Sequence, residues 1–312
     1  MSTPTHDKGS GMPTFDTPEP ISAIFAMAHA TIRVEASARA DTVVEIRPTD
    51  EHNDADVRTA ERTEVEYADG RLVVRGENEQ PGSTAGWGLS LGRLVESPAS
   101  WARSLLLGPG SVEVTVGLPA GSRVDVTSAG SLRCRGPLGE VACTTSYGAI
   151  RVEQAGMLRL KSTHGDISVT RASGHAEVTT THGGILIGRI DGTAAVKTAH
   201  GSVRIREVTG ELRLNSAHGD LTVDRALAGV TAKTAYASLQ IGEVTCGSVV
   251  LETNGGGLDV GIREGTAAWL DVSSTYGTVD VSLDPSDVPG GRDRTVEVRA
   301  HTTHGDILVH RS

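Results

Sequence analysis

The sequence has few aromatic side chains: three tryptophans, four tyrosines and two phenylalanines among 312 residues. Ordinary protein cores obtain much of their buried area from such residues. A core built mainly from valine, isoleucine, leucine and alanine must be narrow, which argues against a conventional globular domain.

Cysteine is scarce as well. Cys134, Cys143 and Cys246 cannot close a disulfide framework, and their spacing contains none of the C-x-x-C pairs that are typical of zinc sites. We expect three reduced thiols that are buried as small hydrophobic side chains.

The sequence has no basic excess, because 29 Lys and Arg residues stand against 39 Asp and Glu residues and give a net charge of −10. Nucleic-acid-binding proteins normally carry a basic patch, so a nucleic-acid partner is not expected. The longest apolar run, at residues 21–30, is shorter than the ~20 residues that span a bilayer. Asp16 and Glu19 precede this run, where a signal peptide needs basic residues. We therefore expect a first strand here, no membrane segment and a cytoplasmic protein.

Sequence motifs of catalysis are missing. There is no nucleophile elbow, P-loop, G-x-G-x-x-G or H-E-x-x-H pattern, and the carboxylates at outward strand positions look scattered. The sequence predicts neither an enzyme nor a bound cofactor.

Glycine, by contrast, is abundant, with 38 residues, and it marks a repeat. The phrase STHGDISV at residues 162–169 recurs in variants, and its aromatic position falls at Tyr147, His164, His182, His200, His218 and Tyr236. The steps between these positions are 17 and then four times 18. Half a period away runs a second glycine column, at residues 139, 156, 174, 192, 210, 229 and 247.

Between the two glycine columns the residues alternate as in half-buried strands. In residues 194–211 the inward set would be Ala194, Val196, Val203 and Ile205. This pattern predicts an all-β, single-chain parallel β-solenoid with coils of about 18 residues, two short strands and two glycine turns per coil, and a right-handed coil. Glycine tolerates the positive φ that tight corners often need. About ten coils at the usual strand spacing would make a rod about 48 Å long.

The chain divides into four predicted parts. Residues 1–19 are rich in Thr, Pro, Gly and Ser and should be a disordered tail. Residues 20–80 should form N-terminal strands or a cap, with an acidic loop near residues 50–56 and a hairpin at Asp69-Gly70. Residues 81–110 are an insertion with a short amphipathic helix, and residues 111–312 are solenoid repeats.

The insertion at 81–110 holds two of the three tryptophans. Its apolar side chains form an interrupted helical stripe, whose members are Trp87, Leu91, Leu94, Trp101 and Leu105. The favoured interpretation is a helix that packs on the flank of the solenoid or plugs its end. The alternative is a surface that binds a partner or a membrane.

A column of four histidines is the strongest candidate for a chemical site. His164, His182, His200 and His218 should stack about 4.8 Å apart on consecutive coils. One interpretation is a metal site, because histidine is the commonest metal ligand. The other is a ladder of stacked rings, which Tyr147 and Tyr236 would continue with an aromatic ring that does not bind metal. Zinc needs three or four ligands converging at ~2 Å, so the ring ladder is favoured, with a pH response as an intermediate hypothesis.

Several segments carry a family resemblance: TIRVEA at 31–36, VVEIRP at 43–48, DGRLVV at 69–74, LPAGS at 118–122 and the repeated GDI-x-V phrases. Over about residues 20–310 the chain resembles a bacterial β-strand-repeat family of adhesin-like proteins built on a domain of unknown function. The resemblance implies a β-solenoid and supplies no catalytic residues.

The functional expectation is a non-enzymatic structural or interaction protein that presents repeated side-chain ladders to a protein partner or associates with itself. One alternative is a cytoplasmic scaffold that polymerises end to end, as bactofilins do. A second is an adhesin exported by a route that the sequence does not reveal. A third is a sensor that uses the histidine column to bind metal or respond to pH.

Overall fold

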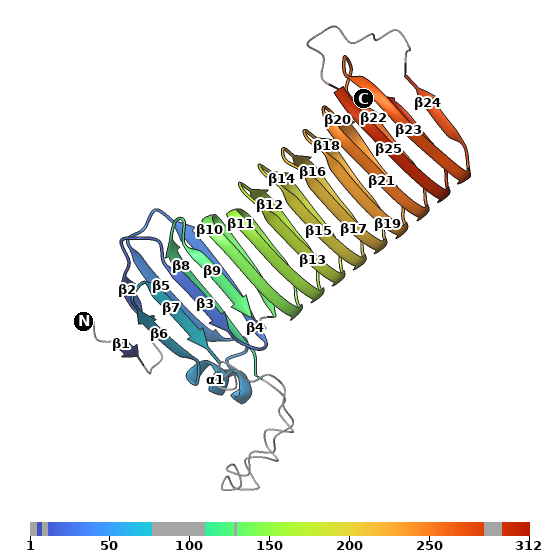
Figure 1. The fold of residues 1–312 in the computed structure, drawn as a ribbon. Coiled ribbons are helices and arrows are strands. Elements are labelled where there is room, and N and C mark those ends of the chain that lie inside the picture. The colour runs from blue at the N-terminus through green and yellow to red at the C-terminus, as the bar shows by residue number, and fades with distance from the viewer. Residues whose placement is uncertain (1–4, 8–11, 77–109, 128–129, 284–294) are drawn as a thin grey trace.

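The computed structural model describes residues 5–7, 12–76, 110–127, 130–283 and 295–312, and its strands stack into a long rod of coils (Figure 1). Each regular coil contributes one strand to each of two faces, and strands of neighbouring coils pair in parallel. The predicted parallel β-solenoid is confirmed, while the handedness of its coil stays a prediction.

The two faces are defined by their strands. Face A contains, in spatial order, β9 (Arg123–Thr127), the second halves of β10 (Ser131–Tyr147) and β11 (Ile150–His164), β13 (Ala176–His182), β15 (Ala194–His200), β17 (Leu212–His218), β19 (Val230–Tyr236), β21 (Gly247–Gly255), β25 (Thr295–His304) and β23 (Ala267–Tyr276). Face B contains the first halves of β10 and β11, then β12 (Ile167–Ala172), β14 (Ile185–Ile190), β16 (Val203–Val208), β18 (Leu221–Ala226), β20 (Leu239–Val244), β22 (Leu258–Ile262), β26 (Ile307–Arg311) and β24 (Val279–Ser282).

The coil length follows directly from the strand register. Ala176 of β13 lies opposite Ala194 of β15, and Ile185 of β14 lies opposite Val203 of β16. Both pairs are 18 residues apart, as the glycine columns predicted. Because the register is constant, each sequence position stacks on its equivalent in the next coil.

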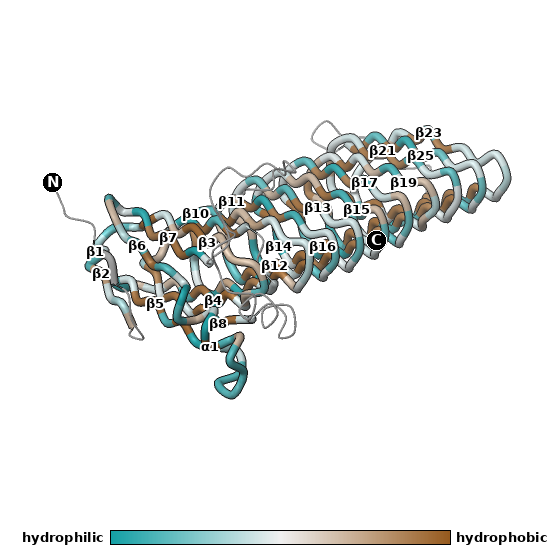
Figure 2. Tube along the Cα trace, turned by 90° about the horizontal axis from the view of Figure 1, so that it is seen from below, coloured by the Kyte–Doolittle hydropathy of each residue, from teal (hydrophilic) through white to brown (hydrophobic). Residues whose placement is uncertain are grey.

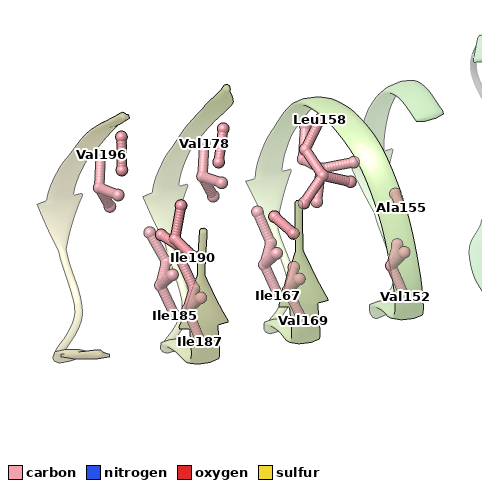
Figure 3. Close-up of a cluster of buried hydrophobic side chains, with 14 of the residues drawn as sticks. Val152, Ala155, Leu158, Ile167, Val169, Val178, Ile185, Ile187, Ile190 and Val196 are labelled. Atoms are coloured by element: carbon pink, nitrogen blue, oxygen red, sulfur yellow. The ribbon is translucent and has the colours of Figure 1, made fainter. Parts of the chain in front are cut away.

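The core is the narrow interior between the faces: hydrophobic residues alternate with hydrophilic ones along the coils (Figure 2), and aliphatic side chains pack in the interior (Figure 3). Val178, Ile187 and Ile205 are 0%, 1% and 0% exposed. Burying one such side chain contributes about 1.5–3 kcal/mol. Among the described residues the buried phenylalanines, Phe15 and Phe25, both belong to the N-terminal end, so the regular coils explain the scarcity of aromatic residues.

The two glycine columns serve the corners in different ways. Gly165, Gly183, Gly201 and Gly219 have positive φ of 112–145°. A β-carbon at Gly201 would also lie only 2.1 Å from the carbonyl oxygen of Gly183. In the other column, Gly192 has no positive φ, but a β-carbon there would lie 2.6 Å from the carbonyl oxygen of Gly174. Close backbone approach, and not the predicted positive φ, therefore selects glycine at most positions of the second column.

At the N-terminal end the coils do not follow the chain order. The strands concerned are β3 (Ser22–Ala26), β4 (Ala30–Ser37), β7 (Arg71–Arg75) and β8 (Val112–Pro119). The β3/β4 coil comes first in the chain, yet it lies between the β7/β8 coil and the β9/β10 coil. The chain's first coil is thus covered on both sides.

Antiparallel strands cover the outer coil. Strand β5 (Asp41–Pro48) pairs with β8, and β6 (Glu64–Ala68) pairs with β7 through the predicted hairpin at Asp69-Gly70. The acidic stretch between β5 and β6 was predicted as a loop, but it forms helix α1 (Asp54–Glu61). The Asn53 side chain accepts a hydrogen bond from Ala55 N at 2.9 Å, and the acidic first turn suits the positive helix N-terminus.

Part of the predicted disordered tail is ordered. Strand β1 (Thr5–Asp7) pairs with β6, and β2 (Thr14–Asp16) pairs with β5, both antiparallel. The Phe15 ring is 8% exposed, and its centroid lies 5.0 Å from that of Tyr67. For residues 14–17 the prediction of disorder is wrong, because one buried aromatic ring anchors a segment whose composition is otherwise typical of disorder.

The C-terminal end repeats the change of order. The last coil of the chain, β25/β26, lies between the β21/β22 coil and the β23/β24 coil. The β23/β24 coil therefore forms the end of the rod (Figure 1). Its inward residues are partly open to solvent, and Val279 and Val281 are each 42% exposed.

The predicted helix of the insertion at 81–110 falls outside the described residues, which include only Gly110 of this segment. Within the described ranges, no helix has the length and apolar character needed to cross a bilayer.

Candidate functional site

An exposed stack of rings runs along one edge of the rod, where face A turns into face B. We call it the aromatic ladder, and its members are Tyr147, His164, His182, His200, His218 and Tyr236. Successive ring centroids are 5.2, 4.9, 5.0, 5.1 and 5.7 Å apart. The three contacts between histidines have interplanar angles of only 1–4°, so the predicted ring ladder is present.

The ladder follows from the coil register and from the corner that comes next. Each ring is the last residue of its strand on face A, and a glycine follows it directly in every case except Tyr236, which is followed by Ala237. All six rings are exposed, and Tyr147 and Tyr236 at the two ends are 67% and 63% exposed.

A column of inward hydroxyl side chains lies two residues before the ladder. Thr145, Thr180 and Ser216 donate to the carbonyl oxygens of Tyr147, His182 and His218 at 2.6–3.2 Å. These bonds to the turn backbone hold the ring-bearing corner in place. The hydroxyls of Ser162, Thr198 and Thr234 are buried without a hydrogen-bond partner.

The geometry of the histidines does not fit a shared metal ion. Parallel imidazoles whose centroids are about 5 Å apart cannot both place a nitrogen at ~2 Å from one ion. The part of the chain that the structure describes also holds no group of three or more His, Cys, Asp or Glu side chains arranged to hold a metal. The observed geometry is that of a stack of rings.

The ladder is interrupted at one coil and then resumes. Gly255 lies opposite Tyr236 in the neighbouring strand and has no ring, and His304 lies opposite Gly255. His304 then stacks on Tyr276 with centroids 4.9 Å apart. A β-carbon at Gly255 would lie 3.0 Å from Cδ1 of Tyr236, so the Tyr236 ring leans over the position where a ring is missing.

Beside this interruption lies an open depression of about 560 Å³ on the outer surface of face A. We call it the polar groove. Side chains from β19, β21, β25 and β23 line it, including Lys233, Glu252, Asn254, His301, Thr303 and Ser273. Lys233 Nζ lies 2.8 Å from Glu252 Oε2, and a hydrogen bond of 2.8 Å joins Ser273 Oγ to His301 Nδ1. The sequence analysis missed this groove.

At the opposite corner of the coils, ion pairs link one coil to the next. The residues 171, 189, 207, 225 and 243 are Arg, Arg, Glu, Arg and Glu at steps of 18, and Asp191 joins the first two. Arg189 Nη1 lies 2.9 Å from Glu207 Oε1. Hydrogen bonds from Arg189 and Arg171 lower the pKa of the Asp191 carboxyl. Carboxylates of this corner, which looked scattered in the sequence, thus pair with arginines of neighbouring coils. The 18-residue step between these positions was the signal in the sequence that could have revealed the pairs.

The remaining predicted binding residues lie outside the described part of the chain. They are Trp87, Leu91, Leu94, Trp101 and Leu105, and their role as a partner surface stays a prediction.

The sequence is similar to one known protein family, and solved structures of low identity also match it. The sequence profile of the Toastrack DUF4097 family matches residues 23–310, and no curated protein matches the chain. Among solved structures, a putative adhesin from Bacteroides fragilis NCTC 9343 is 10% identical, with 97% of this chain and 98% of that chain covered and a TM-score of 0.39. A putative adhesin from Parabacteroides merdae ATCC 43184 is 11% identical, with coverage of 80% and 95% and a TM-score of 0.32. Similarities at these TM-scores carry no conclusion about ligands.

Proposed function

Since the chain belongs to the Toastrack DUF4097 family and folds as a β-solenoid with an exposed stack of rings, we propose that it is a non-enzymatic interaction module. The aromatic ladder is its binding edge. A macromolecular partner with an extended surface, most simply another protein, would contact several rings at once.

The exposure of the rings is the observation that carries this proposal. The whole chain has nine Phe, Trp and Tyr residues, and Tyr147, Tyr236 and Tyr276 lie in this one column at 63–68% exposure. Aromatic side chains are enriched at protein interfaces because they bury a large area with few rotatable bonds. Stacking along the corner of the coils holds these rings in place, so few side chains would lose conformational freedom when a partner binds.

The test is affinity capture from a cell lysate, with the full chain as bait and a His182→Ser/His200→Ser variant beside it. We expect proteins bound by the wild-type chain to be lost with the double variant. His175, an exposed histidine at the opposite corner whose Nδ1 hydrogen-bonds Thr193, supplies the matched control His175→Ser. Equal capture by all three baits would contradict a binding role of the ladder.

A second candidate function, an end-to-end scaffold, is favoured by the open C-terminal end. Within the described residues, β23 and β24 pair only with β25 and β26, and their outer edges are free. Unpaired strand edges are templates for further pairing. A scaffold predicts filaments or concentration-dependent association that Val279→Asp/Val281→Asp abolishes, measured by sedimentation velocity and negative-stain microscopy. A monodisperse wild-type monomer at all concentrations would count against it.

A cytoplasmic location belongs to the same proposal. Its support is that Cys134, Cys143 and Cys246 are all free thiols, which suits a reducing compartment. Burial raises the pKa of the Cys143 thiol to about 12, so this cysteine stays protonated and unreactive at neutral pH. Cell fractionation tests the location, and cleavage of the protein on intact cells by added protease would refute it.

A further inference from the structure

We propose that the polar groove is a binding site for a neutral carbohydrate, with a sugar ring lying over the interruption of the aromatic ladder. Its lining residues lie on the outer surface of face A beside the column, and Tyr236 is the one member of the aromatic ladder that the site shares with the partner surface proposed above.

The non-sequential order of the C-terminal coils builds the groove. Glu252 and Asn254 come from β21, His301 and Thr303 from β25, and Ser273 from β23, and β25 lies between the other two strands. In chain order β23 would come next to β21, and these side chains would not meet in this arrangement. The groove is therefore specific to this end of the rod.

The residue that directly precedes the ring position also changes in type where the groove begins. On the three coils directly before the groove the residue just before the ring is Ala199, Ala217 and Ala235, whereas the first three rings of the ladder follow Ser146, Thr163 and Thr181. On the three coils at the groove the equivalent residue is Asn254, Thr303 or Thr275. Hydrogen-bonding side chains thus replace methyl groups where the surface is hollowed.

The lining selects the class of ligand. No large apolar side chain lines the groove itself, so an apolar ligand could bury only against the Tyr236 ring at its border. Lys233 is the one cation of the lining other than a histidine, and Glu252 pairs with it at 2.8 Å, so the site does not favour an anion. His301 Nδ1 shares a hydrogen bond with Ser273, and no metal cluster exists among the described residues. What remains is a neutral ligand with many donors and acceptors.

A sugar ring meets these conditions. Its neighbouring hydroxyls can donate to the Glu252 carboxylate and accept from Lys233 and the Asn254 amide, and charge-assisted bonds of this kind are the stronger ones. Tyr236 and His304 are two strand spacings apart, about 9.6 Å, with Gly255 between them. The apolar face of a sugar can pack on the Tyr236 ring, as ligands pack on aromatic side chains in binding sites.

The experiment is saturation-transfer NMR on the full chain with two neutral probes, maltotriose and triacetylchitotriose, and with myo-inositol as a non-specific polyol. We expect transfer to at least one trisaccharide and none to inositol. Asn254→Leu, at an exposed position, should weaken binding by about tenfold or more through lost hydrogen bonds. Tyr236→Ser should weaken it as well.

Asn215→Leu is the matched control, because Asn215 is an exposed asparagine of face A that does not line the groove. It should bind the trisaccharide as the wild-type chain does. Absence of transfer to both trisaccharides, equal transfer to inositol, or equal losses in the two asparagine variants would each overturn the proposal.

Discussion

Stacked backbones at the corners of a coil leave very little room for a side chain. Gly201 combines a φ of +144° with a neighbouring carbonyl oxygen 2.1 Å from the place of a β-carbon. Gly265 has a φ of +73° but no atom within 4 Å of that place. At the scale of single residues, comparing these two glycines distinguishes the cost of a positive φ, which both share, from the cost of a steric clash, which only Gly201 has.

We expect Gly201→Ala to lower the free energy of unfolding by about 1–3 kcal/mol more than Gly265→Ala. Both substitutions place alanine at a positive φ, but only the first also forces the neighbouring coil to move. Urea denaturation of the two variants measures the difference. Equal destabilisation would show that the stacked corners yield without cost.

The buried hydroxyl column offers a second comparison of neighbouring positions. Thr180 Oγ1 donates to the His182 carbonyl oxygen at 3.2 Å, whereas Thr198 Oγ1 is buried with no partner. Thr180→Val should therefore lower the free energy of unfolding by about 1 kcal/mol, and Thr198→Val should leave it unchanged or raise it. Thermal denaturation of the two variants tests this, and a larger loss for Thr198→Val would contradict it.

At the scale of strands, parallel pairing in register turns one side chain per coil into a ladder. On one edge the result is a stack of rings, and on the other a chain of ion pairs. Acid acts on the two ladders through different groups, the imidazoles on one edge and the carboxylates on the other.

Acidification should destabilise the ring edge. Protonated imidazoles about 5 Å apart repel each other by about 0.8 kcal/mol per pair in water, and the unfolded chain takes up the same protons without this repulsion. Charging the stacked column therefore lowers the stability of the folded state. We expect a lower Tm at pH 5.5 than at pH 7.5, and a smaller difference after His164, His182, His200 and His218 are all changed to Gln. An equal response in that variant would remove the ladder as the cause.

The ion-pair edge should respond only at lower pH. Since Arg189 and Arg171 lower the pKa of Asp191, its contribution is present above the unfolded value of about 3.9 and is lost as pH falls through the folded value. Asp191→Asn should cost no more than about 1 kcal/mol at pH 7, and the difference from wild type should vanish at strongly acidic pH. Glu211→Gln is the control, because Glu211 is 72% exposed and lies 3.9 Å from Arg213. A Glu211→Gln effect as large as that of Asp191→Asn, or an Asp191→Asn effect that persists at pH 2, would refute this account.

At the scale of the whole molecule, both ends of the rod enclose a terminal coil of the chain. The β3/β4 coil is covered by β7/β8, and the β25/β26 coil is covered by β23/β24. Fraying of a solenoid begins at its ends, because an end coil has a neighbour on one side only. Enclosing the first and last coils protects the parts of the chain nearest its termini.

This order predicts the effect of a truncation. Removal of residues 284–312 takes away β25 and β26, the only strand partners of β23 and β24 within the described residues. We expect the amides of 267–282 to lose their protection against hydrogen exchange, while those of β13–β20 keep theirs as in the full chain. Retained protection in 267–282 would mean that this coil docks on β21/β22 when its neighbour is absent.

The sequence by itself determined the regular part of this protein. The 18-residue step, the alternation of Val196 with Lys197 and the glycine after each histidine of the ladder are local periodic signals, and each coil can satisfy them only by stacking on its equivalents. The ring ladder followed from the same periodicity, because a constant register superposes residues such as His182 and His200.

Only the tertiary structure decided the order of the coils at the two ends, the burial of Phe15 and the polar groove. Strands of neighbouring coils offer nearly the same backbone hydrogen bonds, so the sequence does not reveal that β25 lies between β21 and β23. That choice depends on contacts between segments far apart in the chain. It is also the choice that brings Glu252, His301 and Ser273 to one surface.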